Sequence, residues 1–140
     1  MIKFVLDASV ILKLVLVENE QDQDIALKII KNFQEGKAEI VLPSFWMFEV
    51  GNILIRHHEE FENLYRFILE IEFPAHDFNN RELIEIGNLA KNYQVSFYDA
   101  SYYVLAKLTN SVFVTADEAY FDKAEKAGSI VLLKDLNFAD

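Results

Sequence analysis

Short apolar runs alternate along the chain with longer segments whose apolar residues recur at helical spacing. The short runs predict buried strands at residues 2–6, 39–42, 111–115 and 129–133. The longer segments predict helices at residues 10–16, 22–32, 45–57, 59–72, 80–93, 98–108 and 117–127. Strands separated by helices indicate an α/β domain, in which helices flank a central parallel sheet of four or five strands.

The length and composition indicate one domain with a bulky core. A chain of 140 residues fits a single domain spanning residues 1–140. Hydrophobic residues make up 52% of it, including twelve Phe, six Tyr and one Trp. The four glycines and two prolines are scattered, and neither a repeat nor a linker is visible in the sequence.

The absence of cysteine excludes disulfides and thiolate metal sites, and favours a reducing compartment. The apolar N-terminal stretch ends after a few residues at Asp7, so it lacks the length and cleavage site of a signal peptide. No apolar run approaches the roughly 20 residues of a membrane span. We therefore expect a cytoplasmic protein with no membrane partner.

The formal net charge of −10 works against binding nucleic acid by charge alone. Any nucleic-acid chemistry must then use a local site that is assisted by cations. A strongly acidic surface also suits a basic protein partner, although it can serve solubility only.

Two aspartates follow predicted strands and belong at one edge of the sheet. Asp7 comes directly after the first strand, and Asp117 follows the strand at 111–115 by one residue. Ligands of parallel α/β sheets bind at the carboxyl ends of the strands, which is where both acids are expected. Taken singly, each aspartate has an ordinary alternative explanation as a helix cap.

Two further acids lie on apolar helices. Glu49 belongs to the helix at 45–57, which is apolar nearly all round and is therefore expected to be largely buried. A carboxylate there is costly unless it is paired or metal-bound, the alternatives being a pair with Arg56 or a solvent-facing stripe. Asp99 opens the helix at 98–108, where the helix dipole alone could also explain a carboxylate.

Four converging carboxylates repel each other unless a cation lies between them. Oxygen-only ligands suit Mg²⁺ or Mn²⁺, which bridge a phosphate and activate water. Such a site needs no side-chain nucleophile.

Four segments resemble, in order and spacing, the four motifs of PIN domains. They read LDAS at residues 6–9, FEVGN at 48–52, YDA at 98–100 with Leu105 and Ala106, and VTAD at 114–117. Each motif alone is weak, whereas four in order over essentially the whole chain make a specific signal. A short chain with only this domain is similar to the VapC toxins within the family.

The resemblance implies a three-layer, Rossmann-like fold and a metal-dependent endoribonuclease that cleaves single-stranded RNA. It implies Mg²⁺ or Mn²⁺ as cofactor, a homodimer, and a cognate VapB-like antitoxin in a type II toxin–antitoxin system. The catalytic, metal-binding acids would be Asp7, Glu49, Asp99 and Asp117. The supporting polar residues would be Ser9, Asn52 and Thr115. One departure is that residues 72–80 carry Pro74, His76 and Asp77 where the family usually has a short strand.

Two alternatives stay open from the sequence. The chain could be a catalytically inactive PIN-like interaction module, although all four acids are present. It could also be a phosphoaspartate-type phosphatase of the haloacid-dehalogenase kind with Asp7 as nucleophile, but Ser9 stands where that chemistry usually needs a second acid. Neither a Gly-x-Ser-x-Gly elbow nor a glycine-rich phosphate loop is present in the sequence.

Other polar and aromatic residues have ordinary explanations. The adjacent His57 and His58 face about 100° apart on a helix, so we expect exposed polar residues rather than a shared metal site. Trp46 and the pair Tyr102–Tyr103 are predicted to belong to the core or to a dimer surface rather than to stack on bases.

Overall fold

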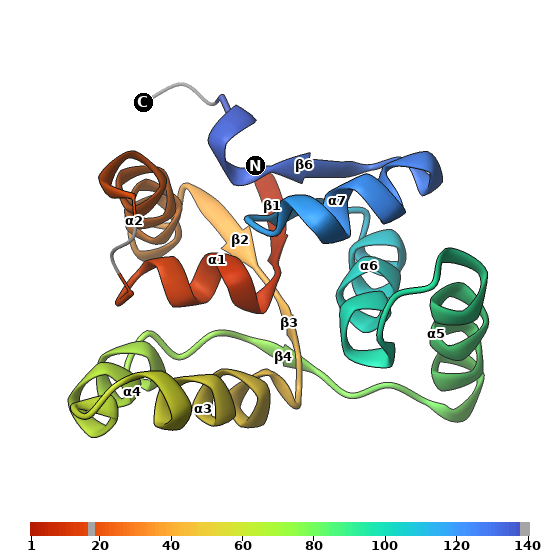
Figure 1. The fold of residues 1–140 in the computed structure, drawn as a ribbon. Coiled ribbons are helices and arrows are strands. Elements are labelled where there is room, and N and C mark those ends of the chain that lie inside the picture. Colours follow the sequence, from red (N-terminus) through yellow and green to blue (C-terminus); the bar gives the residue numbers. More distant parts are fainter. Residues whose placement is uncertain (17–18, 138–140) are drawn as a thin grey trace.

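The main sheet of the protein is parallel and four-stranded, as the sequence predicts. The computed structural model describes residues 1–16 and 19–137, and within them the strand order is β2-β1-β5-β6. The strands are β1 (Ile2–Leu6), β2 (Ala38–Ile40), β5 (Val112–Thr115) and β6 (Ile130–Leu132). Every neighbouring pair is parallel, and β1 lies between β2 and β5 at the centre of the domain (Figure 1).

The prediction of one strand over residues 39–42 is wrong, because the chain changes partners there. β2 ends at Ile40, and the amide of Leu42 then donates a hydrogen bond to the carbonyl of Pro74. The resulting small second sheet pairs β3 (Leu42–Pro43) in parallel with β4 (Ala75–His76). The segment at residues 72–80, which departs from the family pattern in sequence, thus still contains a short strand.

Helices connect the strands at nearly the predicted positions. They are α1 (Ala8–Lys13), α2 (Glu20–Gln34), α3 (Trp46–His57), α4 (Phe61–Leu69), α5 (Asn80–Tyr93), α6 (Phe97–Thr109) and α7 (Glu118–Ala124), with short 3-10 turns η1 (Glu125–Ala127) and η2 (Leu133–Asp135). Helix α5 starts at a capping box in which Asn79 and Glu82 bond to each other's backbone amides. Among the described helices none is long and apolar enough to cross a membrane.

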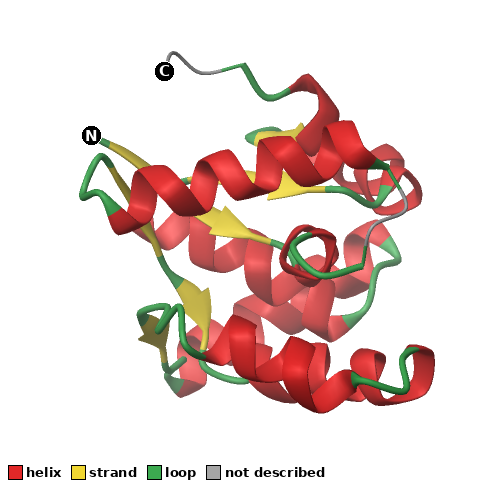
Figure 2. Cartoon of the chain, turned by 90° about the vertical axis from the view of Figure 1, so that its left-hand side faces the viewer, coloured by secondary structure: helices red, strands yellow, loops and turns green. Residues whose placement is uncertain are grey.

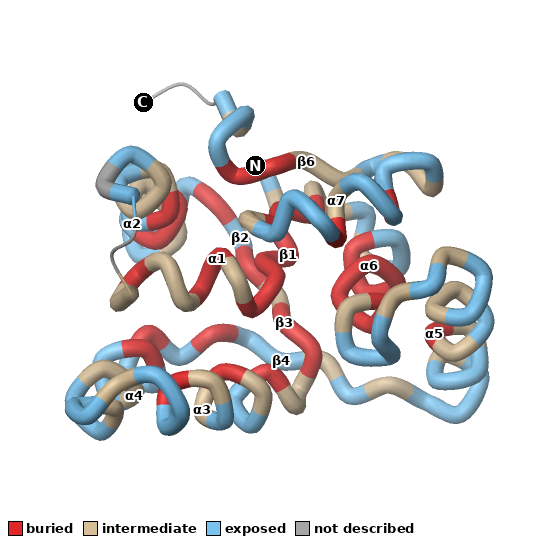
Figure 3. Tube along the Cα trace, viewed as in Figure 1, coloured by how far each residue is buried: buried red, intermediate tan, exposed pale blue. Residues whose placement is uncertain are grey.

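Both faces of the sheet are covered, which gives the expected three-layer arrangement. Phe4, Val5 and Leu6 are consecutive residues of β1 and all are buried, although their side chains point to alternating faces. Helix α6 packs on β1 and β5, while α2 packs on β2 and α7 on β6. Helices lie in front of and behind the strands in Figure 2, and the buried residues gather around β1, β5 and α6 in Figure 3.

The strand order reverses between β1 and β5. From β1 the chain moves outward to β2 on one side, and from β5 it moves outward to β6 on the other side. In open parallel sheets, ligands bind in the crevice at the carboxyl ends of the strands where this reversal occurs. Leu6 is paired with Val114 at that edge, so the residues that follow β1 and β5 lie next to each other.

Helix α3 is amphipathic, so the expectation that it is buried nearly all round is wrong. Its buried stripe is Trp46, Val50 and Leu54, which recur every four residues. On its outer face, Phe48 is 78% exposed and Ile55 is 60% exposed. Helix α4 lies beside α3 and covers only part of it (Figure 1). A helix composed mostly of apolar residues therefore leaves an apolar surface to solvent.

Candidate functional site

Asp7 is a buried carboxylate held by two hydroxyl groups. It follows β1 directly and is only 4% exposed. The hydroxyls of Ser9 and Thr115 both donate hydrogen bonds to Asp7 Oδ2, at 2.7 and 2.9 Å. Asp7 occupies the position before α1, but its side chain makes no capping bond. The helix-cap explanation does not account for this residue.

The same two hydroxyls connect the start of α1 to the turn between β5 and α7. Ser9 Oγ accepts a hydrogen bond from the amide of Ala116 at 2.9 Å, and Thr115 Oγ1 accepts one from the amide of Asp117 at 3.1 Å. Because each hydroxyl both donates to Asp7 and accepts from the turn, the buried carboxylate has a fixed orientation relative to Asp117.

Asp117 is exposed at the end of this turn, and its side chain caps α7. Its Oδ1 accepts a hydrogen bond from the amide of Tyr120 at 3.1 Å. The ordinary explanation of this aspartate as a helix cap is therefore correct as far as the fold is concerned. Any catalytic role of Asp117 has to coexist with that cap.

Glu49 lies in the first turn of α3, half-buried, and is tethered to α6. The hydroxyl of Tyr102, a fully buried residue, donates a hydrogen bond to Glu49 Oε1 at 2.8 Å. The pair with Arg56 considered from the sequence is therefore replaced by a tyrosine partner. The sequence prediction assigned Tyr102 to the core or to a dimer surface, not to the acidic site. The available signal was its spacing, since Tyr102 lies one turn after Asp99 on the same helix.

Asp99 is half-buried in the first turn of α6, and Ser96 takes over the capping role there. The hydroxyl of Ser96 accepts a hydrogen bond from the amide of Asp99 at 2.9 Å. The hydroxyl of Tyr120 donates to the carbonyl of Asp99 at 3.1 Å, which joins α7 to the start of α6. The carboxylate of Asp99 is thus not used as the cap of its own helix.

The pKa values show that these acids share one electrostatic environment. Burial and, to a smaller extent, the nearby charge of Asp99 raise the pKa of Asp7 to about 6, against the lowering effect of its hydroxyl partners. Burial likewise raises the pKa of Glu49 to about 7, with contributions from Asp7 and Asp99. The pKa of Asp99 is also raised, by burial and by repulsion from Asp117. Asp7, Glu49 and Asp99 are therefore electrostatically coupled at the sheet edge, and Asp117 acts on Asp99.

The carboxylate oxygens of the four acids suit a hard divalent cation, but they do not converge on one point in this structure. Within residues 1–16 and 19–137, no three Asp, Glu, His or Cys side chains form a ready-made metal site. Burial raises the pKa values of Asp7, Glu49 and Asp99, and the donor atoms of all four acids are oxygen. A cation at this edge would offset both the desolvation cost of the buried carboxylates and the repulsion between them. It would also draw the side chains closer together. Asn52 is exposed on α3, one turn beyond Glu49.

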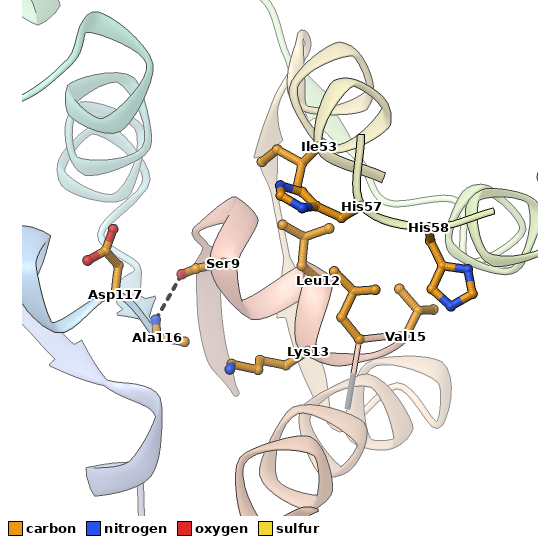
Figure 4. A pocket seen from close by; sticks show the side chains of 10 residues that line it. Ser9, Leu12, Lys13, Val15, Ile53, His57, His58, Ala116 and Asp117 are labelled. Atoms are coloured by element: carbon orange, nitrogen blue, oxygen red, sulfur yellow. Dashed lines mark hydrogen bonds between the residues drawn. The ribbon is translucent and has the colours of Figure 1, made fainter. Parts of the chain in front are cut away.

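A cleft of about 680 Å³ opens beside these acids. Ser9 and Asp117 line one side, and His57 and His58 line the other (Figure 4). A smaller cavity of about 320 Å³ lies beyond and shares Ala116 and Asp117 with the cleft. The exposed carboxylate of Asp117 therefore borders two hollows at the carboxyl end of β5.

Sequence comparison assigns the chain to a family. The sequence profile of the PIN domain matches residues 4–127. The chain therefore belongs to the PIN-domain family, whose members are nucleases, and the predicted family and fold class are confirmed. This assignment separates it from the haloacid-dehalogenase-type phosphatases. No curated protein sequence matches the chain significantly.

Solved structures confirm the fold at low sequence identity. PAE2754 from Pyrobaculum aerophilum is similar with a TM-score of 0.67 and 20% identity, over 95% of this chain and 92% of that one. VapC20 of Mycobacterium tuberculosis, described as a sarcin–ricin-loop-cleaving toxin, is similar with a TM-score of 0.65 and 12% identity, over 90% and 95% of the two chains. FitAB bound to the IR36 DNA fragment gives a TM-score of 0.67 and 15% identity over 98% and 99%.

Among the residues given ordinary explanations, His58 and Tyr102 differ in part from what was expected. Trp46, Tyr102 and Tyr103 are buried. Of the two histidines, His57 is exposed, whereas His58 is partly buried at the end of α3, where its Nδ1 accepts a hydrogen bond from the amide of Glu60 at 3.1 Å. Tyr102 belongs to the core as expected, but its hydroxyl also reaches the acidic site.

Proposed function

We propose that the protein is a Mg²⁺- or Mn²⁺-dependent endoribonuclease that cleaves single-stranded RNA. The observation that carries the proposal is Asp7, a buried carboxylate with a raised pKa at the reversal point of a PIN fold. Three further acids, Glu49, Asp99 and Asp117, lie at the same edge of the sheet as Asp7. Buried, mutually repelling carboxylates are destabilising in a structural role, so their presence favours a site that is completed by a cation.

The four acids would hold the cation, and the remaining polar groups would position the acids. A divalent ion would supply charge neutralisation at the phosphate and lower the pKa of a water molecule. Asp7 would be the most rigid ligand, since Ser9 and Thr115 fix its orientation. Glu49 would be held on the opposite side by Tyr102. Asp117, which is exposed beside the cleft, would be the ligand nearest to an entering strand.

A role as the toxin of a type II toxin–antitoxin system extends this proposal. Support comes from the fold shared with VapC20, which is described as a toxin, and with FitAB, which is described as bound to DNA. The net charge of −10 would favour a basic, VapB-like antitoxin. The exposed apolar side chains of Phe48, Ile55 and Ile84 agree with a homodimer or another protein interface. Cytoplasmic localisation stays a prediction from the sequence.

A cleavage assay tests the enzymatic proposal. The purified chain is incubated with labelled single-stranded RNA in Mn²⁺, in Mg²⁺ and in chelator. We expect metal-dependent cleavage that is lost in Asp7→Asn and in Asp99→Asn. Asp122→Asn is the matched control, because it removes an acid from the exposed face of α7, and it should retain activity. Equal activity in all variants would overturn the assignment of the site.

The competing proposal is that the protein is a catalytically inactive PIN-like interaction module. Its signature would be RNA that stays intact in every metal, together with unchanged binding of Mn²⁺ in the aspartate variants. That outcome would leave the PIN fold as a scaffold only.

A further inference from the structure

One residue of α7, Tyr120, contacts two of the four acids. Its backbone amide donates a hydrogen bond to Asp117 Oδ1 at 3.1 Å. At the other end of the same residue, the hydroxyl donates to the carbonyl of Asp99, also at 3.1 Å. Asp117 follows β5 and precedes α7, whereas Asp99 lies in the first turn of α6. A single side chain therefore spans the distance between two acids that belong to separate elements.

The ring of Tyr120 is fixed by the core of the domain. Tyr120 is only 3% exposed, and its ring packs edge-on against Phe113 with the ring centroids 5.9 Å apart. Phe113 is a fully buried residue of β5, at the centre of the sheet. Because closely packed side chains keep one arrangement, the hydroxyl of Tyr120 has a set position relative to β5. The carbonyl of Asp99 is bonded at that position.

The link from α7 to the start of α6 is made by side chains. Helix α7 packs mainly on β5 and β6, so close packing of the two helices does not explain the link. The bond from Tyr120 is also not needed to begin α6, because Ser96 caps that helix. Lys123, one turn after Tyr120, donates to the carbonyl of Gln94 at 3.4 Å. Two side chains of α7 therefore hold residues 94–99, the segment that leads into α6 and carries Asp99.

We infer that Tyr120 is a positioning residue that fixes Asp99 relative to Asp117. It acts through the backbone of Asp99 and the carboxylate of Asp117, and it contacts neither the cation nor the RNA itself. Two like-charged side chains tend to move apart, so a rigid link between them keeps both available to one cation. This role toward a cation rests on the proposed function, and it identifies what holds the two acids together before the ion binds.

Calorimetry with Mn²⁺ on the intact chain tests this role. Tyr120→Phe keeps the ring and its packing but removes the bond to Asp99, and we expect the Mn²⁺ dissociation constant to rise about tenfold, the lower end for groups that orient metal ligands. Tyr103→Phe is the matched control. The ring of Tyr103 also packs edge-on against Phe113, at 6.1 Å, and its hydroxyl also donates to backbone carbonyls, but at the opposite side of α6.

The two variants should lose similar thermal stability in chelator, whereas only Tyr120→Phe should lose affinity for Mn²⁺. Unchanged affinity in Tyr120→Phe, or an equal loss in Tyr103→Phe, would overturn the role of Tyr120 toward the metal site.

Amide hydrogen exchange in chelator separates failure of this inference from failure of the nuclease proposal, because it needs no metal. The amides of Asp99 and residue 120 bond to Ser96 Oγ and Asp117 Oδ1. In Tyr120→Phe both should exchange about threefold faster or more, relative to amides elsewhere in α6, and in Tyr103→Phe they should keep the wild-type rates. Faster exchange would support the positioning of the two acids even if the wild type bound no Mn²⁺. Wild-type rates in Tyr120→Phe would contradict it, whatever the protein binds.

Discussion

Tyr102 donates a hydrogen bond to Glu49 Oε1 at 2.8 Å, joining α6 to α3 across 53 residues of sequence. The adjacent Tyr103 is also buried, but its hydroxyl donates to the carbonyls of Ala127 and Gly128 at the opposite side of α6. Burial and the neighbouring carboxylates raise the pKa of Tyr102 far above its usual range, so its hydroxyl stays a donor at physiological pH. One tyrosine thus belongs to the acidic site and its neighbour does not.

Removing the Tyr102 hydroxyl should weaken metal binding. In Tyr102→Phe, Glu49 loses the donor that orients it, and outer partners of metal ligands typically change affinity by about tenfold or more. We expect the Mn²⁺ dissociation constant to rise about tenfold, as measured by calorimetry. Tyr103→Phe is the matched control and should bind Mn²⁺ like the wild type. Equal affinities in the two variants would show that Tyr102 has only a packing role.

Without metal, stability should decrease as the pH rises from about 4 to 7. Asp7 has a folded pKa of about 6 against its ordinary 3.8, and Glu49 has about 7 against 4.5. Both stabilise the fold when protonated, so their contribution is present at low pH and is lost on ionisation. For Asp7 the difference corresponds to roughly 3 kcal/mol.

Thermal melts in chelator at pH 5 and pH 8 measure this dependence. Asp7→Asn should reduce the difference between the two pH values and should raise the melting temperature at pH 8. Added Mn²⁺ should stabilise the wild type more at pH 8, because the ion competes with protons for the carboxylates. A wild-type pH dependence that is identical to that of Asp7→Asn would contradict the raised pKa.

Thr115→Val should disturb both the fold and the site. The valine keeps the shape of the side chain, but it leaves Asp7 Oδ2 with one fewer donor and the amide of Asp117 without its acceptor. We expect a loss of about 1–2 kcal/mol in the free energy of unfolding, together with weaker Mn²⁺ binding. Thr109→Val, at the far end of α6, is the control for metal affinity. A similar loss of affinity in both variants would argue against a specific role.

Asp117→Ser separates the capping role of Asp117 from a catalytic one. Serine is a good N-cap, so it should replace the bond to the amide of Tyr120 with little change in the melting temperature. Its neutral hydroxyl is a poor ligand for a divalent ion, and RNA cleavage should fall at least tenfold. Retained cleavage at unchanged stability would mean that Asp117 is a helix cap only.

Local sequence signals predicted the elements whose ends are set by interactions within the element itself. Helix α5 matches the predicted range because Asn79 and Glu82 form a capping box at its start. The strand predicted over residues 39–42 failed for a nonlocal reason. Leu42 bonds to Pro74, a partner 32 residues later, and no periodicity within the segment can show that the chain changes sheets.

In the candidate site, too, some features follow from the local sequence and others depend on nonlocal packing. Asp7 and Asp117 could be placed at the sheet edge because each follows a strand, and parallel strands align their carboxyl ends. The Tyr102–Glu49 tether and the exposed face of α3 could not be predicted. Both depend on how α3 packs against other helices, and composition alone predicted that α3 is largely buried.

Binding of Mn²⁺ to the wild type and to Asp99→Asn, measured side by side by calorimetry, tests the central claim most directly. Asp99 interacts electrostatically with Asp7, Glu49 and Asp117, so a shared cation site should depend on it. The account predicts binding by the wild type and at least a tenfold loss of affinity in a variant that remains folded. Equal affinity in the two proteins would contradict a metal centre built from these four acids.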